Sequence, residues 1–446
     1  MRNLDELPVA LGGPPVRDPG SATRTPIITG ADRSRVDSYL RAADFQPASQ
    51  ALSAPCEAEP LLLPVGSLGA EQEALSREFT QVHGNGANDF HSIPVSNGTR
   101  AIALALTAIS AHARRLGLRK PVVGDNVIVP ALTWSATATA ALEKGFVPRL
   151  ADVDEQTLCL DPSSVEALVD DRTFAIIAVH LYNRVADLGE LKRIADERGI
   201  ALIEDCAHAH GARYRGEPVG AIGTAGTFSL QASKTLTCGE GGMITTRDGL
   251  LAEQLCSLAN CGRPCGDAIG IPAGNDRLPG LSAALARAQL DEFETRQAAR
   301  TEVWRRLDDL ATSLPGVDPF PAQPDVVAPT YKWAARYPRE QWGGLSPDLL
   351  AQALTAELDV EVSRVYEPLN RSRLYQPAED PLIGTVHGTD ELDPSRYDCP
   401  VAARLYESVL VIEHAAALSD DFVESYAVAV RKVHEHAKRI AHSPTR

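Results

Sequence analysis

One lysine stands in a segment whose residue types suit covalent chemistry. Thr227 and Phe228 favour a strand that leads into Ser229. Lys234 follows five positions later, before a Gly-Glu-Gly-Gly turn at residues 239–242. We expect this lysine to lie between strands, where a poorly solvated amine loses its proton more readily and can form a Schiff base with an aldehyde cofactor or a carbonyl substrate. Taken alone, though, it is one of 43 Lys and Arg residues, most of which are ordinarily exposed.

A second chemical feature lies upstream of this lysine. Residues 200–203 are apolar, and Glu204 and Asp205 follow them, a pattern typical of a buried parallel strand. Ligands of open α/β sheets bind at the carboxyl ends of strands, so Asp205 is expected to face a cofactor. A carboxylate beside a pyridine nitrogen keeps that nitrogen protonated, which pyridoxal phosphate chemistry requires. The packing of a hydrophobic core alone gives no reason for both Asp205 and Lys234 to be present.

These motifs occur in a fixed order: Glu-Asp-Cys-Ala-His-Ala-His-Gly-Ala at 204–212, Gly-Thr-Phe-Ser at 226–229, Lys234, and the turn at 239–242. The set resembles the DegT/DnrJ/EryC1/StrS family of sugar and cyclitol aminotransferases, from about Gly66 to the C-terminus. The resemblance implies fold-type I, with pyridoxal 5'-phosphate as cofactor. It also implies that Lys234 carries the Schiff base and that Asp205 contacts the pyridine nitrogen.

The stretch from Ile93 to Thr99 predicts a strand that turns into a helix. Backbone amides at a helix start, with a small residue beside them, can form a phosphate cradle. On these residues alone a plain N-cap by Asn97 or Thr99 is favoured. The resemblance reverses this preference, because it implies that Gly98 and Thr99 bind the cofactor phosphate together with the hydroxyl of Ser229, a suitable donor to an oxyanion.

Three further residues are assigned with the help of the resemblance. Trp134 follows a predicted strand and could face the core or stack on a planar ring. The resemblance implies that Trp134 covers the cofactor ring and that His208 meets the cofactor hydroxyl, at a position where glutamine is common. His210 has the same chemistry, but a satisfied polar residue is the better interpretation of it.

The Gly-Asn-Asp-Arg segment at 274–277 bears on assembly. In the resembled family this segment crosses a dimer interface, and its asparagine touches the phosphate of the neighbouring subunit. Asn275 takes that position here. The resemblance therefore implies a homodimer with shared active sites.

Strands and helices are predicted to alternate along the chain, which favours a mainly parallel sheet of the seven-stranded type in a large domain and a smaller C-terminal α/β domain. The division expected is a leader and irregular segment at 1–65, a large cofactor-binding domain at 66–280, and a connector helix with the small domain at 281–446. Strands are expected at 126–130, 148–153, 174–179, 200–205 and 410–413. Helices are expected at 31–43, 69–81, 101–115, 163–169, 188–198, 250–258, 282–310, 346–358 and 420–440.

Composition limits the partners. The chain has 446 residues, 44% of them hydrophobic, which is ample for a large core. A net charge of −16 argues against nucleic acid or an anionic membrane, since phosphate binding needs clustered cations. No signal-peptide pattern opens the chain and no run approaches roughly 18 apolar residues, so a cytoplasmic protein is expected. Eight scattered cysteines indicate free thiols, and the cluster Cys256, Cys261 and Cys265 lacks a fourth ligand, so no metal is expected.

The candidate substrate contacts lie in predicted loops. Tyr182 lies in a loop that closes a strand end, although family members usually have glycine where Asn183 stands. Residues 366–370 and 374–377 resemble segments of aminotransferases that act on inosose-type ketones in aminoglycoside pathways. Tyr182, Tyr366 and Asn370 are therefore the expected substrate contacts, because neutral donors and acceptors suit a hydroxyl-rich ring. Three arginines nearby could equally serve a phosphate or carboxylate: Arg364, Arg371 and Arg373.

The leading hypothesis is a pyridoxal-phosphate aminotransferase that moves an amino group from a donor, by resemblance L-glutamine, to a keto-cyclitol or keto-sugar in secondary metabolism. Lys234 would also move the proton between substrate carbon and cofactor. One alternative is a dehydratase or aromatising enzyme of the amino-hydroxybenzoate synthase type, which similarly has histidine at the position of His208. Another is a catalytically silent partner subunit, against which the intact Lys234 and Asp205 count.

Overall fold

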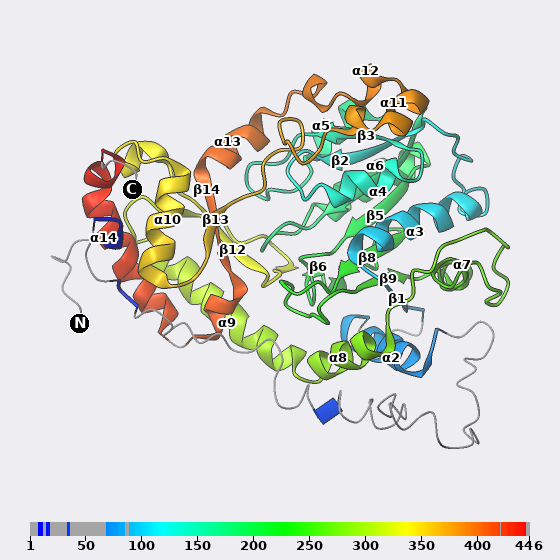
Figure 1. The fold of residues 1–446 in the computed structure, drawn as a ribbon, viewed down its shortest axis with the longest axis horizontal. Coiled ribbons are helices and arrows are strands. Elements are labelled where there is room, and N and C mark those ends of the chain that lie inside the picture. The colour runs from blue at the N-terminus through cyan, green and yellow to red at the C-terminus, as the bar shows by residue number, and fades with distance from the viewer. Residues whose placement is uncertain are drawn as a thin grey trace, which may run out of the picture.

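A seven-stranded sheet forms the centre of the molecule (Figure 1). The computed structural model describes residues 8–11, 15–17, 34–35, 68–84, 89–419 and 421–442. The strand order is β1-β9-β8-β5-β4-β2-β3, in which β9 is antiparallel to both neighbours and the pairs from β8 to β3 are parallel. The strands are β1 (His91–Val95), β2 (Asn126–Pro130), β3 (Val147–Ala151), β4 (Thr173–Val179), β5 (Ala201–Asp205), β8 (Ala225–Ser229) and β9 (Gly242–Thr246). This confirms the predicted fold class.

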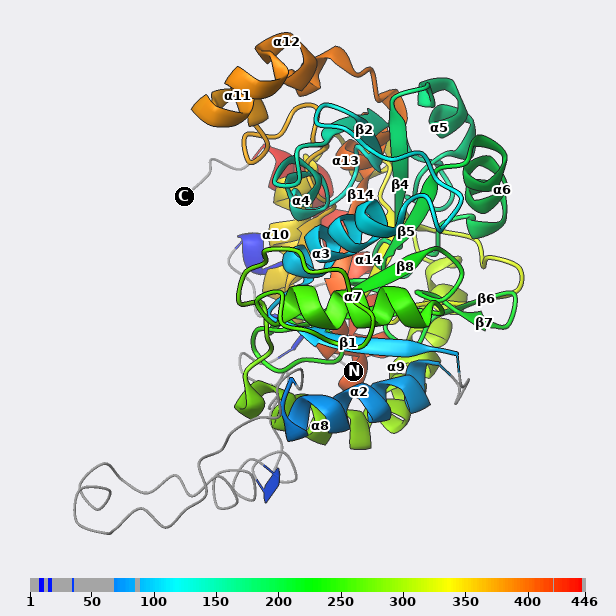
Figure 2. The same cartoon turned by 90° about the vertical axis from the view of Figure 1, so that its right-hand side faces the viewer.

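Helices cover this sheet, and the sequence sets where they begin. Aspartates accept backbone N–H groups at the starts of α5, α6 and α7, and Gly199 ends α6 in the left-handed conformation. In Figure 2, α3 and α7 cross in front of the sheet, while α5 and α6 lie beside it. The helices are α2 (Ala70–His83), α3 (Gly98–His112), α4 (Ala136–Leu142), α5 (Pro162–Leu168), α6 (Leu188–Arg198) and α7 (Gly249–Ala259). Each lies within three residues of its predicted bounds where a helix was predicted.

A second, smaller sheet has its own hydrophobic core. Its order is β10-β12-β14-β13, all antiparallel, and α9 (Phe293–Ala311), α10 and α14 supply most of the remaining core. Trp333 and Trp342 are fully buried in this core. The elements are β10 (Asp318–Pro319), β12 (Lys332–Arg336), η2 (Arg339–Trp342), α10 (Pro347–Leu358), β13 (Val362–Arg364), β14 (Val409–Glu413), η5 (His414–Leu418) and α14 (Phe422–Ala441). A division of the chain near residue 280 stays a prediction.

The predicted single helix at 282–310 is wrong. The structure has two helices there, α8 (Gly280–Asp291) and α9 (Phe293–Ala311). Glu292 leaves helical geometry, with φ −107° and ψ 1°. Phe293 then buries its ring against His83, with 5.3 Å between ring centroids. Side-chain periodicity could not indicate the break, because apolar residues recur at helical spacing on both sides of it.

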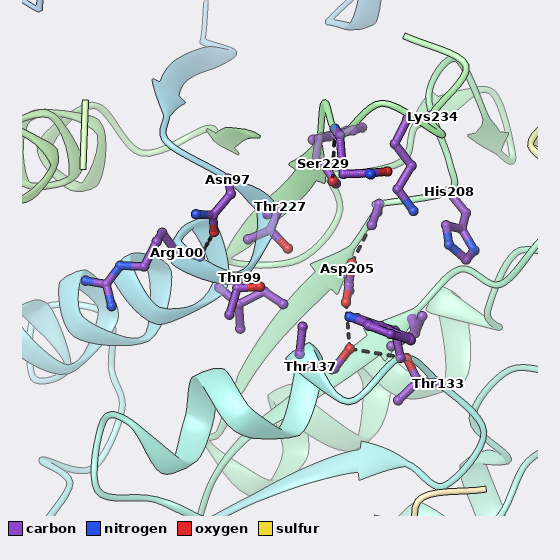
Figure 3. A pocket seen from close by; sticks show the side chains of 18 of the residues that line it. Asn97, Thr99, Arg100, Thr133, Thr137, Asp205, His208, Thr227, Ser229 and Lys234 are labelled. Carbon is purple, nitrogen blue, oxygen red and sulfur yellow. Dashed lines mark hydrogen bonds between the residues drawn. The ribbon is translucent and has the colours of Figure 1, made fainter. Parts of the chain in front are cut away.

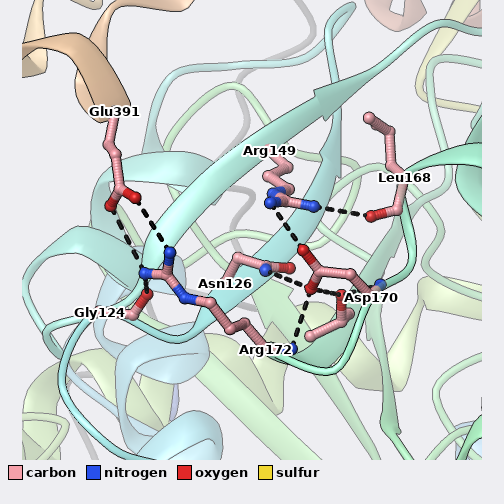
Figure 4. A network of polar contacts seen from close by, with 8 residues as sticks. Gly124, Asn126, Arg149, Leu168, Asp170, Arg172 and Glu391 are labelled. Atoms are coloured by element: carbon pink, nitrogen blue, oxygen red, sulfur yellow. Dashed lines mark hydrogen bonds and ion pairs between the residues drawn. The ribbon is translucent and has the colours of Figure 1, made fainter.

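The segment between β13 and β14 returns to the large sheet. Glu391 on α12 binds Arg172 at 2.9 Å, beside a cluster in which Asp170 joins Asn126 and Arg149 (Figure 4). The ion pair of Glu391 and Arg172 fastens the segment beside the start of β4. Its elements are η3 (Pro377–Glu379), α11 (Pro381–His387), α12 (Thr389–Leu392), η4 (Pro394–Arg396) and α13 (Pro400–Ser408). A three-stranded sheet also occurs, with β6 (Arg213–Tyr214), β7 (Glu217–Pro218) and β11 (Val326–Val327).

Residues 8–11 and 15–17 of the leader lie beside the helices of the small sheet, whereas Arg35 pairs with Asp291 on α8. η1 (Val9–Leu11) and Arg17 both contact Glu357, whose carboxylate accepts the backbone N–H of Val9 at 2.7 Å. The expected helix at 31–43 and the irregular stretch at 45–64 lie outside the described residues, apart from 34–35. Among the described helices, none combines the length and apolar character needed to span a membrane.

Candidate active site

A cavity of about 650 Å³ opens where β5 and β8 end. Side chains from the start of α3, the start of α4, the end of β5 and the loop after β8 line it (Figure 3). The sequence had predicted that ligands bind at the carboxyl ends of these strands. Seven of the residues singled out as cofactor contacts line this cavity: Gly98, Thr99, Trp134, Asp205, His208, Ser229 and Lys234.

The start of α3 and the end of β8 touch directly. A Cβ on Gly98 would lie 2.9 Å from the Cβ of Ser229, and one on Gly242 would lie 2.6 Å from the backbone of Asn97. Asn97 caps α3 by accepting the Arg100 N–H at 2.8 Å. The N-cap and the cradle are thus compatible, since Gly98 and Thr99 line the cavity beside the Ser229 hydroxyl. Such a helix start fits a phosphate.

Asp205 ends β5 and is almost fully buried. Thr137 donates to its Oδ2 at 2.8 Å, and the Ala207 N–H donates to its Oδ1 at 3.2 Å. Burial raises the pKa of this carboxyl, while those two hydrogen bonds and the charge of Lys234 act in the opposite direction. An oriented carboxylate in a low-dielectric site suits the protonated nitrogen of a pyridine ring.

Lys234 extends into the cavity from the loop between β8 and β9 (Figure 3). Its Nζ lies 4.5 Å from the centroid of the Tyr331 ring. Burial lowers the pKa of Lys234 from 10.5 to about 8; the charge of Lys332 adds to this and that of Asp205 opposes it. The amine is therefore easier to deprotonate than that of a surface lysine, as covalent chemistry requires.

His208 is neutral and fixed in one tautomer. Burial lowers its pKa well below the ordinary value. The Tyr182 N–H donates to Nδ1 at 3.2 Å, so the proton is on Nε2, which lies 3.4 Å from the Tyr366 hydroxyl. The ring stacks on Tyr331 at 4.1 Å between centroids. His208 thus presents an N–H donor, whereas His210 is buried behind it among aromatic rings.

Two of the expected substrate contacts do not line this cavity. Tyr182 is buried, and its hydroxyl accepts the Tyr366 N–H at 2.9 Å. Asn370 is also buried and donates to the Tyr397 carbonyl at 3.0 Å. The Tyr182 hydroxyl and the Asn370 amide nitrogen thus serve contacts within the protein, while Asn370 Oδ1 is buried without a hydrogen-bond partner among the described residues. A substrate role for either residue stays a prediction. Tyr366, the third, does line the cavity, 5.6 Å from the Trp134 ring.

Asn275 also lies away from the cavity wall of its own chain. It is exposed and pairs with Asn260 through an isolated β-bridge. The next residue, Asp276, holds Arg100 at the start of α3 through two hydrogen bonds of 2.8 and 3.0 Å. The loop is therefore attached to the start of α3, while Asn275 itself is exposed.

Sequence reasoning missed two residues that shape the site. Thr137 orients Asp205, and Tyr331 forms the wall beside Lys234 and His208. Thr137 stands in a run of small residues at a strand end, which was a usable signal. Tyr331 comes from the small sheet and is 97 residues beyond Lys234, so no local pattern connects them.

A buried trio beside the site could be mistaken for a metal centre. Ligand atoms of His180, Glu204 and Cys206 lie within 4.8 Å of one another. The Glu204 carboxylate, however, already accepts backbone N–H groups of Gly220 and Ile222 at 2.6 and 2.8 Å. The Glu204 carboxylate therefore stabilises the turn at residues 220–222, before β8. These hydrogen bonds account for a buried carboxylate without an ion.

Comparison with known proteins agrees with this geometry. The chain is 37% identical over 385 residues to the L-glutamine:scyllo-inosose aminotransferase of Streptomyces griseus, covering 83% of this chain and 88% of that protein. It is 38% identical over 394 residues to the L-glutamine:2-deoxy-scyllo-inosose aminotransferase of Streptomyces kanamyceticus, covering 85% and 88%. Among solved structures, 3-amino-5-hydroxybenzoic acid synthase matches with a TM-score of 0.71 and 28% identity, over 92% of this chain and 97% of that one.

The family profile covers the region that contains the whole cavity. The DegT/DnrJ/EryC1/StrS aminotransferase family matches residues 65–431. This range includes the start of α3, the buried carboxylate and the lysine loop. The chain therefore belongs to the DegT/DnrJ/EryC1/StrS family of pyridoxal-phosphate-dependent aminotransferases.

Proposed function

We propose that this protein transfers the amino group of L-glutamine to a neutral keto-cyclitol or related polyhydroxylated ketone in secondary metabolism, with pyridoxal 5'-phosphate as cofactor. The observation that carries the proposal is the identity of 37–38% to two inosose aminotransferases over more than four fifths of the chain. When bound, the cofactor supplies an aldehyde that takes up amines and a protonated ring that accepts electrons.

Different residues of the cavity would bind different parts of this cofactor. Gly98, Thr99 and Ser229 would bind its phosphate at the start of α3. Asp205 would hold the proton on the ring nitrogen, and the Nε2–H of His208 would donate to the ring hydroxyl. These assignments rest on the lining of the cavity and on the donor and acceptor pattern described above.

Trp134 and Lys234 complete the proposed cofactor site. Trp134 is 52% exposed, so its indole is free to cover a planar ring. Lys234 supplies the amine that carries the cofactor. The same amine, with a pKa near 8, is suited to take a proton from the substrate carbon and return it at the cofactor.

The charge of the cavity wall favours a neutral acceptor. Among the described lining residues, the Lys and Arg side chains are Lys234 and Arg100, and Arg100 is bound by Asp276 and Glu143. The three arginines that could have served a diphosphate do not line the cavity: Arg364, Arg371 and Arg373. Arg364 forms ion pairs with Asp348 and Glu407 instead. Little cationic charge of one chain is left for a nucleotide diphosphate.

The test is a comparison of acceptors. Purified protein is incubated with L-glutamine and either free scyllo-inosose and its 2-deoxy form or nucleotide-linked keto-sugars, and products are identified by mass. We expect amination of the free keto-cyclitols at clearly higher kcat/KM. A preference for nucleotide-linked sugars would overturn the acceptor assignment and leave the transaminase assignment intact.

The shared active site is a second part of the proposal. Asn275 faces outward beside the cradle, as a residue that serves a neighbouring subunit would. Subunits with Lys234→Ala are mixed with subunits with Asn275→Asp, so that heterodimers combine both lesions in one site and leave the other intact. Activity should return relative to either variant alone. Heterodimers without activity would contradict the assignment in trans.

The similarity to 3-amino-5-hydroxybenzoic acid synthase keeps one other candidate in view. An enzyme of that type would remove water from its substrate instead of exchanging an amino group. The lower identity, 28% against 37–38%, makes it the second choice. The same mass analysis distinguishes the two, because a dehydrated product requires no glutamine.

A further inference from the structure

The turn that carries Lys234 is held from outside by the small sheet. Within the turn, the Lys234 N–H donates to the Gln231 carbonyl at 2.9 Å. Ser233 N and Oγ both donate to the Gln231 Oε1, each at 2.8 Å. These bonds shape residues 231–234 but do not fix the turn relative to the rest of the cavity.

Two side chains from the small sheet contact Ser233, the residue before the lysine. The Tyr331 hydroxyl lies 3.2 Å from Ser233 Oγ, and because that Oγ gives its proton to Gln231, Tyr331 is the donor. His414 Nε2 lies 3.0 Å from the Ser233 carbonyl, which can only accept. His414 therefore carries its proton on Nε2, and burial keeps the ring neutral by lowering its pKa to about 3.

The register of the small sheet brings these two donors together. Lys332 on β12 pairs with Glu413 on β14 in antiparallel register. Tyr331 precedes the first and His414 follows the second, so they lie at the same end of the sheet, with 6.0 Å between ring centroids. The Tyr331 ring also lies beneath Lys234 Nζ. One end of the small sheet thus contacts the lysine turn at three points.

We propose that Tyr331 and His414 are positioning residues, through which the small sheet fixes Ser233 and thereby places the Lys234 amine in the cavity. This inference rests on the proposed cofactor role of Lys234. It assigns to these residues a function beyond packing: the rate at which Lys234 becomes attached to the cofactor depends on both donors.

The experiment measures attachment directly on the cofactor-free protein. Pyridoxal phosphate is added, the absorbance change is followed in stopped flow, and borohydride reduction with mass spectrometry counts the label at Lys234. His414→Phe and Tyr331→Phe keep the rings and remove the donors. Each should slow attachment roughly three- to tenfold, the loss expected for one neutral hydrogen bond. His442→Phe and Tyr406→Phe, at sites remote from Ser233, should keep the wild-type rate.

A double-mutant cycle separates positioning from general packing. Tyr331→Phe should add little to Ser233→Ala, because both remove the same bond, whereas His414→Phe should add its full effect. Wild-type attachment rates in Tyr331→Phe, His414→Phe and Ser233→Ala, or a lower Tm with an unchanged rate, would overturn the inference. If His414→Phe does not fold, His414→Gln, which retains an N–H donor, should restore folding. The attachment rates of the Tyr331→Phe and Ser233→Ala variants then test the inference. Failure of the wild type itself to attach would instead contradict the proposed function.

Discussion

Lys432 is buried and Lys234 is partly buried, and the surroundings of their amines differ in one respect. Lys432 on α14 lies between the helices of the small core, where its Nζ binds the Glu357 Oε2 at 3.0 Å. Lys234 lines the cavity, and its Nζ lies over the Tyr331 ring, with Asp205 acting only through its charge. One ammonium has a bonded carboxylate, and the other has an aromatic face.

The comparison teaches how burial can serve structure or chemistry. A paired buried lysine keeps its charge in place and holds its partner, which here also accepts the backbone N–H groups of Val9 and Val16. An unpaired one pays the desolvation cost as a lowered pKa, about 8 for Lys234, and so becomes available as a nucleophile and base. Removing Lys234 should therefore abolish activity, whereas removing Lys432 should lower stability.

Lys234→Ala should have the largest effect of the changes considered. No other described lysine lines the cavity, so covalent attachment of the cofactor and turnover should both be lost, a decrease of more than roughly 10⁴-fold for a residue that acts as nucleophile and base. Absorbance of the attached cofactor and the rate of amine formation check this. Lys432→Met is the matched control and should retain the wild-type kcat per folded molecule; the reverse pattern would refute the comparison.

Asp205→Asn should come next. An amide cannot hold the ring nitrogen protonated, so we expect turnover to fall about 10³-fold while the cofactor still attaches to Lys234. The same strand offers a control, because Glu204→Gln alters a carboxylate that faces the Gly220 turn and not the cavity. Glu204→Gln should lower the Tm with a much smaller loss of kcat. Near wild-type turnover in Asp205→Asn would show that another acid faces the ring.

Lys432→Met should act on stability. Breaking a buried ion pair leaves an uncompensated charge on Glu357, so the free energy of unfolding should decrease by about 3–5 kcal/mol in urea titrations. Adding Glu357→Leu should recover only part of this loss, since the N–H groups of Val9 and Val16 then lose their acceptor. Full recovery would mean that the carboxylate serves the lysine alone.

The smallest expected effect is on stability at low pH. It comes from a buried histidine that does not line the cavity and whose ring nitrogens have no hydrogen-bond partner among the described residues. His83 stacks on Phe79 at 3.8 Å, and burial lowers its pKa to about 3. The unfolded chain binds a proton below about pH 6.5 and the folded chain does not, so this contribution to stability is complete above about pH 6.5 and is lost as the pH falls toward 3. At about pH 5 the loss is roughly 2 kcal/mol for this residue.

His83→Phe tests that expectation. Urea midpoints are measured near pH 7.5 and near pH 5. The variant should lose less stability on acidification than the wild type, while His442→Phe, at an exposed site, should behave like the wild type. An unchanged pH dependence in His83→Phe would place the acid sensitivity elsewhere, for example at His210, whose pKa is also lowered by burial.

Much of the fold and part of the site followed from local patterns. The apolar run 174–179 specifies β4, and the Asp187 cap and the Gly199 end specify α6, whatever surrounds them. Asp205 was found because it ends an apolar strand, and Lys234 was found because it lies in the turn five residues after the end of another strand. Tyr182 and Asn370 do not line the cavity, and their residue types could not reveal that the Tyr182 hydroxyl and the Asn370 amide nitrogen contact backbone groups of the folded chain. Their role as substrate contacts stays a prediction.

The sequence by itself therefore determined the order of strands and helices, the acidic strand end and the lysine turn, since capping, periodicity and strand ends act over a few residues. Only the tertiary structure decided that Lys432 is paired and Lys234 is not, that Thr137 orients Asp205, and that Tyr331 and His414 contact Ser233. These contacts join residues 68 to 181 positions apart. Their distances depend on how the two sheets pack together, which no local pattern encodes.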